Sequence, residues 1–173
     1  MRELSRVSAG GFLVHPVRGG GGVVVSGPVR ILVTGSRLWV DAAAVEEPLT
    51  NALYDVLQAG LPGVVVVHGA APGADSLADV WAWRRRDWGV ACEAVAADWA
   101  GPCVPGCPPG HRRVRRGGGD YCPLAGHRRN QVMVDRGATV CLAFPLGRST
   151  GTRDCMRRAA AEGIRVLDLG LGL

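Results

Sequence analysis

Three cysteines and a histidine follow one another at short intervals, in the pattern Cys103-x3-Cys107-x3-His111-x10-Cys122. Three thiolates and one imidazole are a common ligand set of a closed, tetrahedral structural zinc site. The segment around them, 99–124, is rich in Pro, Gly, Cys and Arg and has no hydrophobic period. A bound metal would give such a segment the order that it cannot gain from a core of its own. The pattern therefore predicts a structural zinc loop.

Other interpretations of these cysteines stay open at this point. They could be free thiols of a solvated loop, or they could form a disulfide, although no secretory signal is evident and a reducing cytosol keeps thiols unlinked. We expect a cytoplasmic protein. His127 is an alternative ligand to His111, but it lies beside Arg128-Arg129-Asn130 on an expected helix. The other three cysteines, Cys92, Cys141 and Cys155, are expected to be small buried residues.

A second set of residues could bind an anion. Three segments that follow apolar runs combine glycine with hydroxyl, guanidinium or carboxylate groups. Backbone amides at such places point toward a phosphate when a helix begins there. Each segment alone is also ordinary turn chemistry, and Asp75 could equally cap a helix. The candidate ligand-binding residues in these segments are Gly35, Ser36, Arg37, Gly69, Gly73, Asp75, Gly147, Ser149, Thr150, Gly151 and Thr152.

The elements that would position these residues alternate between strand and helix. Strands are expected at 29–33, 64–67, 91–97, 139–144 and 164–169, and helices at 41–59, 75–87, 125–136 and from the end of the 145–152 loop to 162. This order requires right-handed crossovers and a parallel sheet covered on both faces. We therefore predict an α/β, Rossmann-like doubly wound sheet with a Cys-rich insertion, in which the three candidate segments share one sheet edge.

Composition limits the remaining possibilities. The 173 residues are 47% hydrophobic, and no apolar run is long enough to span a membrane. Residues 1–28 are predicted to be a flexible, Gly-rich leader, and residues 29–173 one domain. All 20 basic residues are arginine, which excludes a P-loop lysine. The positive charge gathers in residues 100–136, where it could meet phosphates or simply keep a loop solvated.

Four stretches together resemble a known superfamily. Residues 31–37 (ILVTGSR), 68–75 (HGAAPGAD), 126–130 (GHRRN) and 147–152 (GRSTGT) are similar to the SLOG superfamily. That superfamily includes the LOG phosphoribohydrolases, the DprA/Smf proteins and the YspA/YpsA-like group. The resemblance covers about residues 29–170 and is strongest to the YspA-like branch, a domain of unknown function.

The resemblance implies a nucleotide-type ligand, and it adds Arg129 and Asn130 as contacts to ribose or phosphate. In the LOG enzymes an arginine and a glutamate cleave an N-glycosidic bond. Arg129 falls at the arginine position, whereas Cys155 stands at the glutamate position and Asp154 is one residue early. A carboxylate stabilises the oxocarbenium-like state of such a cleavage. Asp75 or Asp154 would have to replace it, so the candidate catalytic residues are Arg129 and Asp75.

The sequence thus favours binding, sensing or processing of a nucleotide-like phosphorylated ligand. A LOG-like nucleoside-monophosphate phosphoribohydrolase and DprA-like binding of single-stranded DNA through the Arg-rich loop are the alternatives. Nucleic acid is not the favoured partner, because no aromatic side chain alternates with the arginines at 112–116. The resemblance also implies a homodimer.

Overall fold

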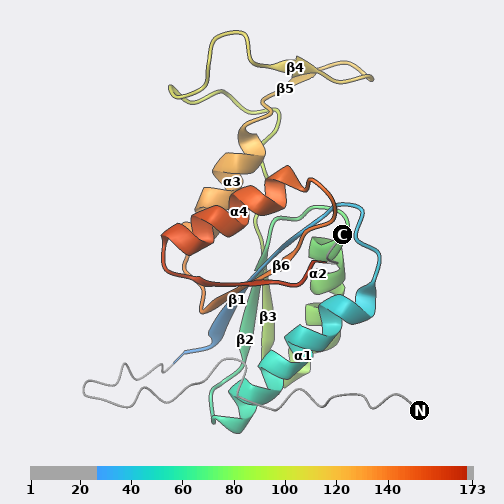
Figure 1. Ribbon diagram of the computed structural model, residues 1–173, viewed down its shortest axis with the longest axis vertical. Coiled ribbons are helices and arrows are strands. Elements are labelled where there is room, and N and C mark those ends of the chain that lie inside the picture. Colours follow the sequence, from blue (N-terminus) through green and yellow to red (C-terminus); the bar gives the residue numbers. More distant parts are fainter. Residues whose placement is uncertain (1–26, 171–173) are drawn as a thin grey trace.

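A computed structural model describes residues 27–170 of the protein. Within that part of the chain, five parallel strands form one sheet in the order β3-β2-β1-β6-β7, and helices cover both of its faces (Figure 1). The predicted Rossmann-like, doubly wound fold is confirmed. The sheet strands are β1 (Val29–Gly35), β2 (Val64–His68), β3 (Val90–Ala94), β6 (Val140–Phe144) and β7 (Arg165–Asp168), and the helices are α1 (Ala42–Gln58), α2 (Ala74–Arg84), α3 (Ala125–Asp135) and α4 (Thr150–Ala161).

Two hydrophobic cores sandwich the sheet because side chains of a strand alternate between its faces. On β1, Ile31 and Val33 pack with residues of α1 and α2, whereas Leu32 packs with residues of α3 and α4. All five residues of β2 and of β6 are buried. The central strands are therefore covered on both faces, as the continuous β-branched run in β2 predicts.

The strand order reverses beside β1. The chain runs from β1 outward to β2 and β3, and then returns to the other side of β1 with β6 and β7. β1 pairs with β2 on one side and with β6 on the other, in parallel register. In open α/β sheets a ligand crevice lies beyond the carboxyl ends of the strands at such a switch point.

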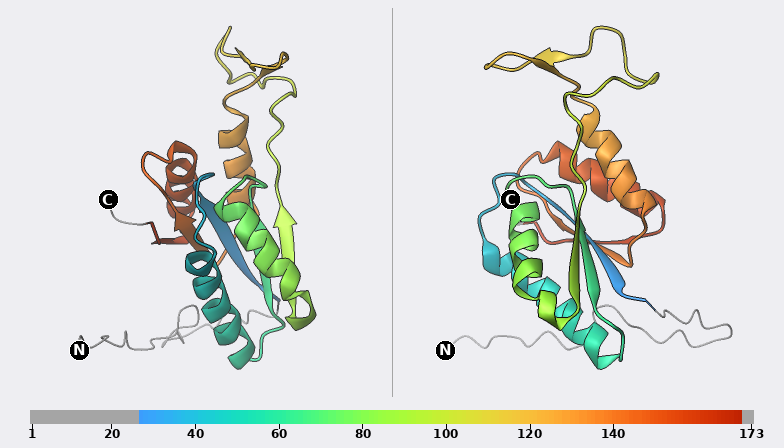
Figure 2. Two further views of the ribbon diagram at one scale, coloured as in Figure 1. Left: turned by 90° about the vertical axis from the view of Figure 1, so that its right-hand side faces the viewer. Right: turned by 180° about the vertical axis from the view of Figure 1, so that it is seen from behind.

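The insertion between β3 and α3 contains a small antiparallel hairpin that the sequence pattern did not reveal. Its strands are β4 (Arg113–Val114) and β5 (Asp120–Tyr121), and Arg113 pairs with Tyr121. Figures 1 and 2 show that the insertion extends from the end of the sheet where the strands finish. It therefore lies on the same side of the molecule as the loops that follow β1, β2 and β6.

The sequence favours core or packing positions for Trp81, Trp83 and Trp88, with Trp81 and Trp88 on one apolar stripe of the helix expected at 75–87, and this prediction is wrong for two of the three. Trp81 is completely buried, but Trp83 and Trp88 are 66% and 65% exposed. Helix α2 ends at Arg84, and a short 3-10 turn at Arg86–Trp88 turns the expected apolar stripe outward. Cys92 is exposed because it lies on the edge strand β3, whereas Cys141 and Cys155 are buried as predicted.

Two expectations concern the chain beyond this fold. Nearly all of the predicted leader at 1–28 lies outside the described residues, so that prediction stays untested. Among the described residues, no helix combines the length and the apolar character needed to cross a membrane.

Glu93 carries a pH-dependent stabilising contact across the sheet. Arg30 of β1 donates two hydrogen bonds to the Glu93 carboxylate of β3, with distances of 2.8 and 2.9 Å, and Arg136 contacts the same carboxylate. The hydrogen bonds from Arg30 lower the pKa of Glu93 to about 2. The folded-state pKa is thus depressed, so the contact stabilises above the unfolded pKa near 4.5 and is lost as the pH falls toward 2.

We predict that Glu93→Gln lowers the free energy of unfolding at neutral pH, because it removes the ion pair with Arg30. The loss should be only about 0.5–1 kcal/mol, because the Glu93 carboxylate is partly exposed and solvent screens its charge. The difference from wild type should shrink below pH 4.5 and vanish near pH 2. Urea unfolding at several pH values measures it. A deficit that does not change with pH would contradict the assignment.

Candidate functional site

A cavity of about 510 Å³ opens at the switch point, and we call it the first compartment. It lies between the loop after β1, the start of α2, the first turns of α3 and the loop that leads from β6 into α4. Its wall includes ten of the predicted ligand-binding residues, which are Gly35, Ser36, Arg37, Asp75, Arg129, Asn130, Ser149, Thr150, Gly151 and Thr152. The structure therefore brings together segments that are more than 100 residues apart in the chain.

Three further predicted residues lie elsewhere. Gly69 lines a neighbouring cavity of about 750 Å³, the second compartment. Gly73 and Gly147 line neither compartment. At Gly73 a side chain would overlap the Ser36 carbonyl, and the φ of +81° is in the region that favours glycine. Its place is thus between two loops, which it allows to approach each other.

Asp75 holds the loop after β2 in shape. Its Oδ2 accepts hydrogen bonds from the backbone N–H groups of Gly69 (2.9 Å) and Ala71 (3.2 Å). It lies inside α2 rather than at the N-cap, which is Gly73. Burial raises the pKa of Asp75, while these N–H donors and the nearby Arg129 oppose the rise. Asp75 is therefore a buried carboxyl group whose proton affinity is higher than usual and which borders the first compartment.

Arg129 and Asn130 project from α3 into the same region. The Arg129 guanidinium donates to the Gly69 carbonyl, and its Nε donates to Asn130 Oδ1 over 3.1 Å. Burial lowers the pKa of Arg129, and the charge of Asp75 opposes this. Asn130 in turn donates to the Gly151 carbonyl (3.0 Å) and to Asp154 (3.1 Å) of α4. The pair ties α3 to the loops on both sides of the switch point.

The loop after β6 leads into α4 earlier than expected. The helix begins at Thr150, so Thr150, Gly151 and Thr152 are its first turn rather than part of the 145–152 loop. Ser149 is the N-cap residue, but its hydroxyl bonds Leu146 rather than the helix. A helix N-terminus carries N–H groups without an intrahelical partner, which favour a nearby anion.

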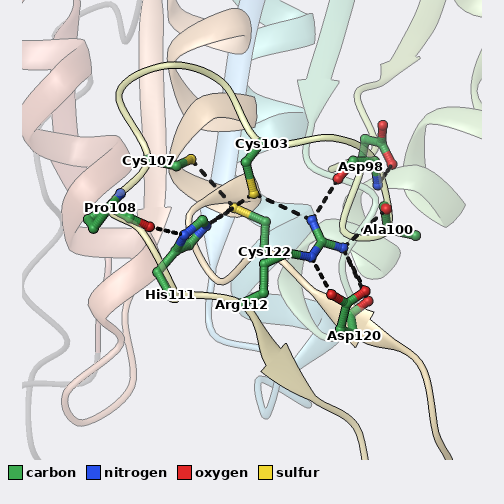
Figure 3. Close-up of polar contacts among 10 residues, drawn as sticks. Asp98, Ala100, Cys103, Cys107, Pro108, His111, Arg112, Asp120 and Cys122 are labelled. Atoms are coloured by element: carbon green, nitrogen blue, oxygen red, sulfur yellow. Dashed lines mark hydrogen bonds and ion pairs between the residues drawn. The ribbon is translucent and has the colours of Figure 1, made fainter.

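The four predicted metal ligands lie together in the insertion (Figure 3). The Sγ atoms of Cys103, Cys107 and Cys122 and a ring nitrogen of His111 all lie within 4.8 Å of one another. His111 Nε2 is 3.3 Å from Cys103 Sγ and 3.1 Å from Cys122 Sγ. These residues can therefore hold a metal ion. The alternative ligand, His127, instead contacts Asp154 over 3.2 Å.

The surroundings of the cluster fit metal binding. His111 Nδ1 is 2.5 Å from the Pro108 carbonyl, which can only accept, so Nδ1 carries the proton and Nε2 is available as a ligand. Arg128 donates to the Cys107 and Cys122 sulfurs over 3.3 and 3.2 Å. Burial raises the pKa of the Cys122 thiol, but hydrogen bonding, led by the bond that Arg128 donates, outweighs it and lowers that pKa to about 6.

A second group of metal-ligand types, His68, Asp79 and Cys92, fits a metal less well. His68 Nε2 is 3.3 Å from Asp79 and 3.2 Å from Cys92. The Ala70 N–H donates to Nδ1, so the proton is on Nε2, the nitrogen that faces the other two residues. Burial and Asp79 also raise the pKa of Cys92 to about 12. His68 is a buried histidine at the end of β2 whose two ring nitrogens both have partners.

The family comparisons agree with this geometry. A model of the YspA, cpYpsA-related SLOG family matches residues 29–101. The chain is also 44% identical over 143 residues to the "Gene 61 protein" of Mycobacterium phage D29, a similarity that covers 82% of this chain and 96% of that protein. The chain belongs to the YspA-like SLOG family. Both the resemblance seen in the sequence and the Rossmann-like fold are thereby confirmed, and a nucleotide-related ligand is what membership in this family suggests.

The position of the LOG glutamate carries no exposed acid in this SLOG domain. Cys155 is completely buried between the sheet and α4. Asp154 is 4% exposed, and its carboxylate is occupied by Asn130 and by Arg158, which donates over 2.9 Å. Asp154 is therefore part of the packing that holds α3 against α4, and of the two proposed substitutes only Asp75 lines the first compartment.

Sequence reasoning missed several residues of the site. The first compartment is also lined by Leu38, Ala71, Trp99, Pro123, Gly126, His127, Leu146 and Arg148, together with Thr34 at the end of β1. Trp99 is the most informative of these, because it lies between the two compartments and borders both. The signal was its position just after the third strand, where a parallel sheet places ligand loops.

Gly73 gives a direct test of how the loops are held. Gly73→Ala should destabilise the fold by about 1–3 kcal/mol, because the new methyl group meets the Ser36 carbonyl and the backbone is strained. Gly147→Ala is the matched control. It also has a positive φ (58°), but its side-chain direction is open, so it should cost only about 1 kcal/mol. Equal losses in chemical denaturation would refute the close approach.

Proposed function

We propose that this SLOG domain binds a nucleotide or nucleotide-derived phosphorylated ligand in the first compartment. The observation that carries the proposal is the convergence of three strand-end loops and three arginines, Arg37, Arg129 and Arg148, on one cavity at the switch point. The loops after β1, β2 and β6 lead to the helices α1, α2 and α4. Guanidinium groups and N-terminal amides favour phosphate, and no lysine competes with them for this role.

The residues suggest how such a ligand would lie. The first turn of α4, with Thr150 and Gly151, would receive the phosphate, and Arg37 and Arg148 would neutralise it. Arg129 and Asn130 would then lie near the ribose. Trp99 offers an aromatic face to the base, since an indole side chain can stack on any nucleobase. These assignments use only residues that line the cavity.

Cleavage of an N-glycosidic bond is a second candidate function. Asp75 lines the same compartment as Arg129, and burial raises its pKa. A carboxyl group of raised pKa near a cavity is a candidate acid–base group. Incubation of the purified protein with a nucleoside monophosphate tests it. Release of free base would show turnover, and ligand binding without base release would restrict the domain to sensing.

Binding of adenosine monophosphate, measured by titration calorimetry, tests the proposal. Arg37→Ala should weaken binding by roughly tenfold or more, because it removes a charge-assisted contact to phosphate. Arg129→Ala should have a similar effect. Arg37 is exposed, so its removal leaves the fold intact, which the melting temperature checks.

Arg84→Ala is the matched control, because Arg84 is 60% exposed, lies at the far end of α2 and lines neither compartment. It should leave the affinity unchanged. The proposal fails if neither adenosine monophosphate nor other nucleoside monophosphates bind, or if Arg84→Ala weakens binding as much as Arg37→Ala does.

We also propose that zinc occupies the cluster of Cys103, Cys107, His111 and Cys122, since three thiolates and one imidazole are a structural zinc set. The assignment of 1–28 as a leader and 29–173 as one domain with an insertion at 99–124, the homodimer and a cytoplasmic location stay predictions.

Metal analysis of protein purified without added metal tests the zinc proposal. We expect about one zinc per chain. His111→Ala should release zinc or weaken its binding by at least about tenfold, whereas His127→Ala should retain it. A metal content near zero in the wild-type protein, or a larger loss in His127→Ala than in His111→Ala, would overturn the assignment.

A further inference from the structure

The second compartment lies between the insertion hairpin and the body of the domain. Its volume is about 750 Å³. The hairpin contributes Val114, Arg115, Arg116 and Tyr121, and the body contributes the loop after β2 and the segment after β3. None of these hairpin residues is needed for the nucleotide site proposed above. The compartment is thus a second cavity, of the size that small-molecule sites have.

The two compartments share a wall. Arg37, Ala71, Trp99 and Arg129 line both of them. A ligand bound at the first turn of α4 could therefore extend past Trp99 into the second compartment without passing through the protein core. The shared residues include two arginines and one aromatic ring, which suit a linking phosphate group and a base on either side.

The second compartment has the chemistry of a base site of its own. Trp99 and Tyr121 meet edge to face, with ring centroids 6.3 Å apart. The Arg37 guanidinium lies 5.6 Å from the Trp99 ring centroid, and the Arg115 guanidinium lies 5.4 Å from that of Tyr121. Flat π faces bordered by guanidinium groups favour a nucleobase attached to phosphate, because stacking and charge act together.

The metal cluster is joined directly to this wall. Cys122 follows Tyr121, which lines the second compartment, and precedes Pro123, which lines the first. Its backbone N–H donates to the Trp99 carbonyl over 2.9 Å. Arg112, which follows the ligand His111, binds Asp120 of β5 over 2.6 and 3.0 Å and the Gly101 carbonyl over 2.8 Å (Figure 3).

These contacts hold only the base of the hairpin. Apart from the cluster, Arg112 and the contact of Tyr121 with Trp99 hold the hairpin, and its strands have two residues each. A two-stranded hairpin of this size is not stable alone. A metal ion that joins Cys103, Cys107, His111 and Cys122 would close the segment that carries Arg115 and Tyr121.

We propose that the ligand of this domain contains two nucleosides joined by a diphosphate. The second nucleoside binds in the second compartment, between Trp99 and the hairpin. The metal-bound cluster of Cys103, Cys107, His111 and Cys122 holds that compartment in place. This inference rests on the proposed nucleotide site. It assigns the Arg-rich hairpin to a small ligand rather than to a nucleic-acid chain, because Tyr121 of the hairpin and Trp99 line one compartment that adjoins the first.

Paired titrations test the second nucleoside. Adenosine monophosphate and diadenosine diphosphate are titrated into the zinc-loaded, full-length protein. Diadenosine diphosphate should bind at least about tenfold more tightly, as expected for one additional stacked base. Tyr121→Ala and Arg115→Ala should each remove most of that advantage and leave the affinity for adenosine monophosphate within about twofold.

Arg113→Ala is the matched control, because Arg113 lies on the same hairpin and is exposed, but does not line the compartment. It should retain the advantage. Equal affinities for the two probes in the wild-type protein would overturn this inference but leave the proposed function standing, whereas failure of both probes to bind would overturn both. Tighter binding of a single-stranded DNA oligonucleotide of about ten nucleotides would also overturn it, in favour of nucleic acid.

The role of the metal is tested by titrating the same two probes before and after a chelator removes the metal. The apo protein should lose the roughly tenfold advantage of diadenosine diphosphate and keep its affinity for adenosine monophosphate within about threefold. Re-addition of zinc should restore the advantage. A full advantage in protein shown to be metal-free would refute the role of the cluster, and circular dichroism verifies that the sheet and helices remain folded.

Discussion

The site depends on how closely the backbone can approach itself at the carboxyl edge of the sheet. The loop after β1 and the start of α2 touch at Gly73 and the Ser36 carbonyl, and Gly35 lies directly against Ala74 and Phe144. A side chain at these glycines would separate the loops. Close packing of three loops is what lets arginines from distant parts of the chain face one cavity. The glycines thus let the loops pack closely, and the arginines face the cavity.

Polar groups beneath the cavity hold its loops and helices together. Asp75 ties the loop after β2 to α2, and Asn130 ties α3 to the start of α4. Asp154 is enclosed by Asn130, Arg157, Arg158 and His127, and hydrogen bonds from Arg158 and Asn130 outweigh burial and lower its pKa. The carboxylates of this region are therefore committed to structure, with Asp75 alone also bordering the cavity. This favours recognition of a ligand over hydrolysis.

The sequence predicted the fold well because short apolar, strand-like runs alternate along it with longer helix-like segments. Val64–Val67 indicated a strand buried on both faces, and the structure buries it there. The metal cluster was also predictable, because ligand spacing within 20 residues restricts where the four side chains can lie. The hairpin at 113–121 was not, because two-residue strands leave no period to detect.

Tertiary context decided the remaining details. Glycine at 73 was expected to face a ligand, but a sequence does not show which side of a tight backbone faces a neighbouring loop. Trp99 was overlooked because a single aromatic residue after a strand has no partner in sequence, and its contacts with Arg37, Tyr121 and both compartments arise only in the fold. Exposed Trp88 shows the reverse error, in which helical spacing was extended past the end of α2, whereas Trp83 lies within α2 on its exposed side.

A crystal structure of the protein with adenosine monophosphate tests the central claim most directly. The account predicts the phosphate at the first turn of α4, within hydrogen-bonding distance of the backbone amides near Thr150 and of Arg37 or Arg148, with the loops after β1 and β6 on either side. A nucleotide found at another face of the domain, or a first compartment closed by side chains in that crystal, would contradict it.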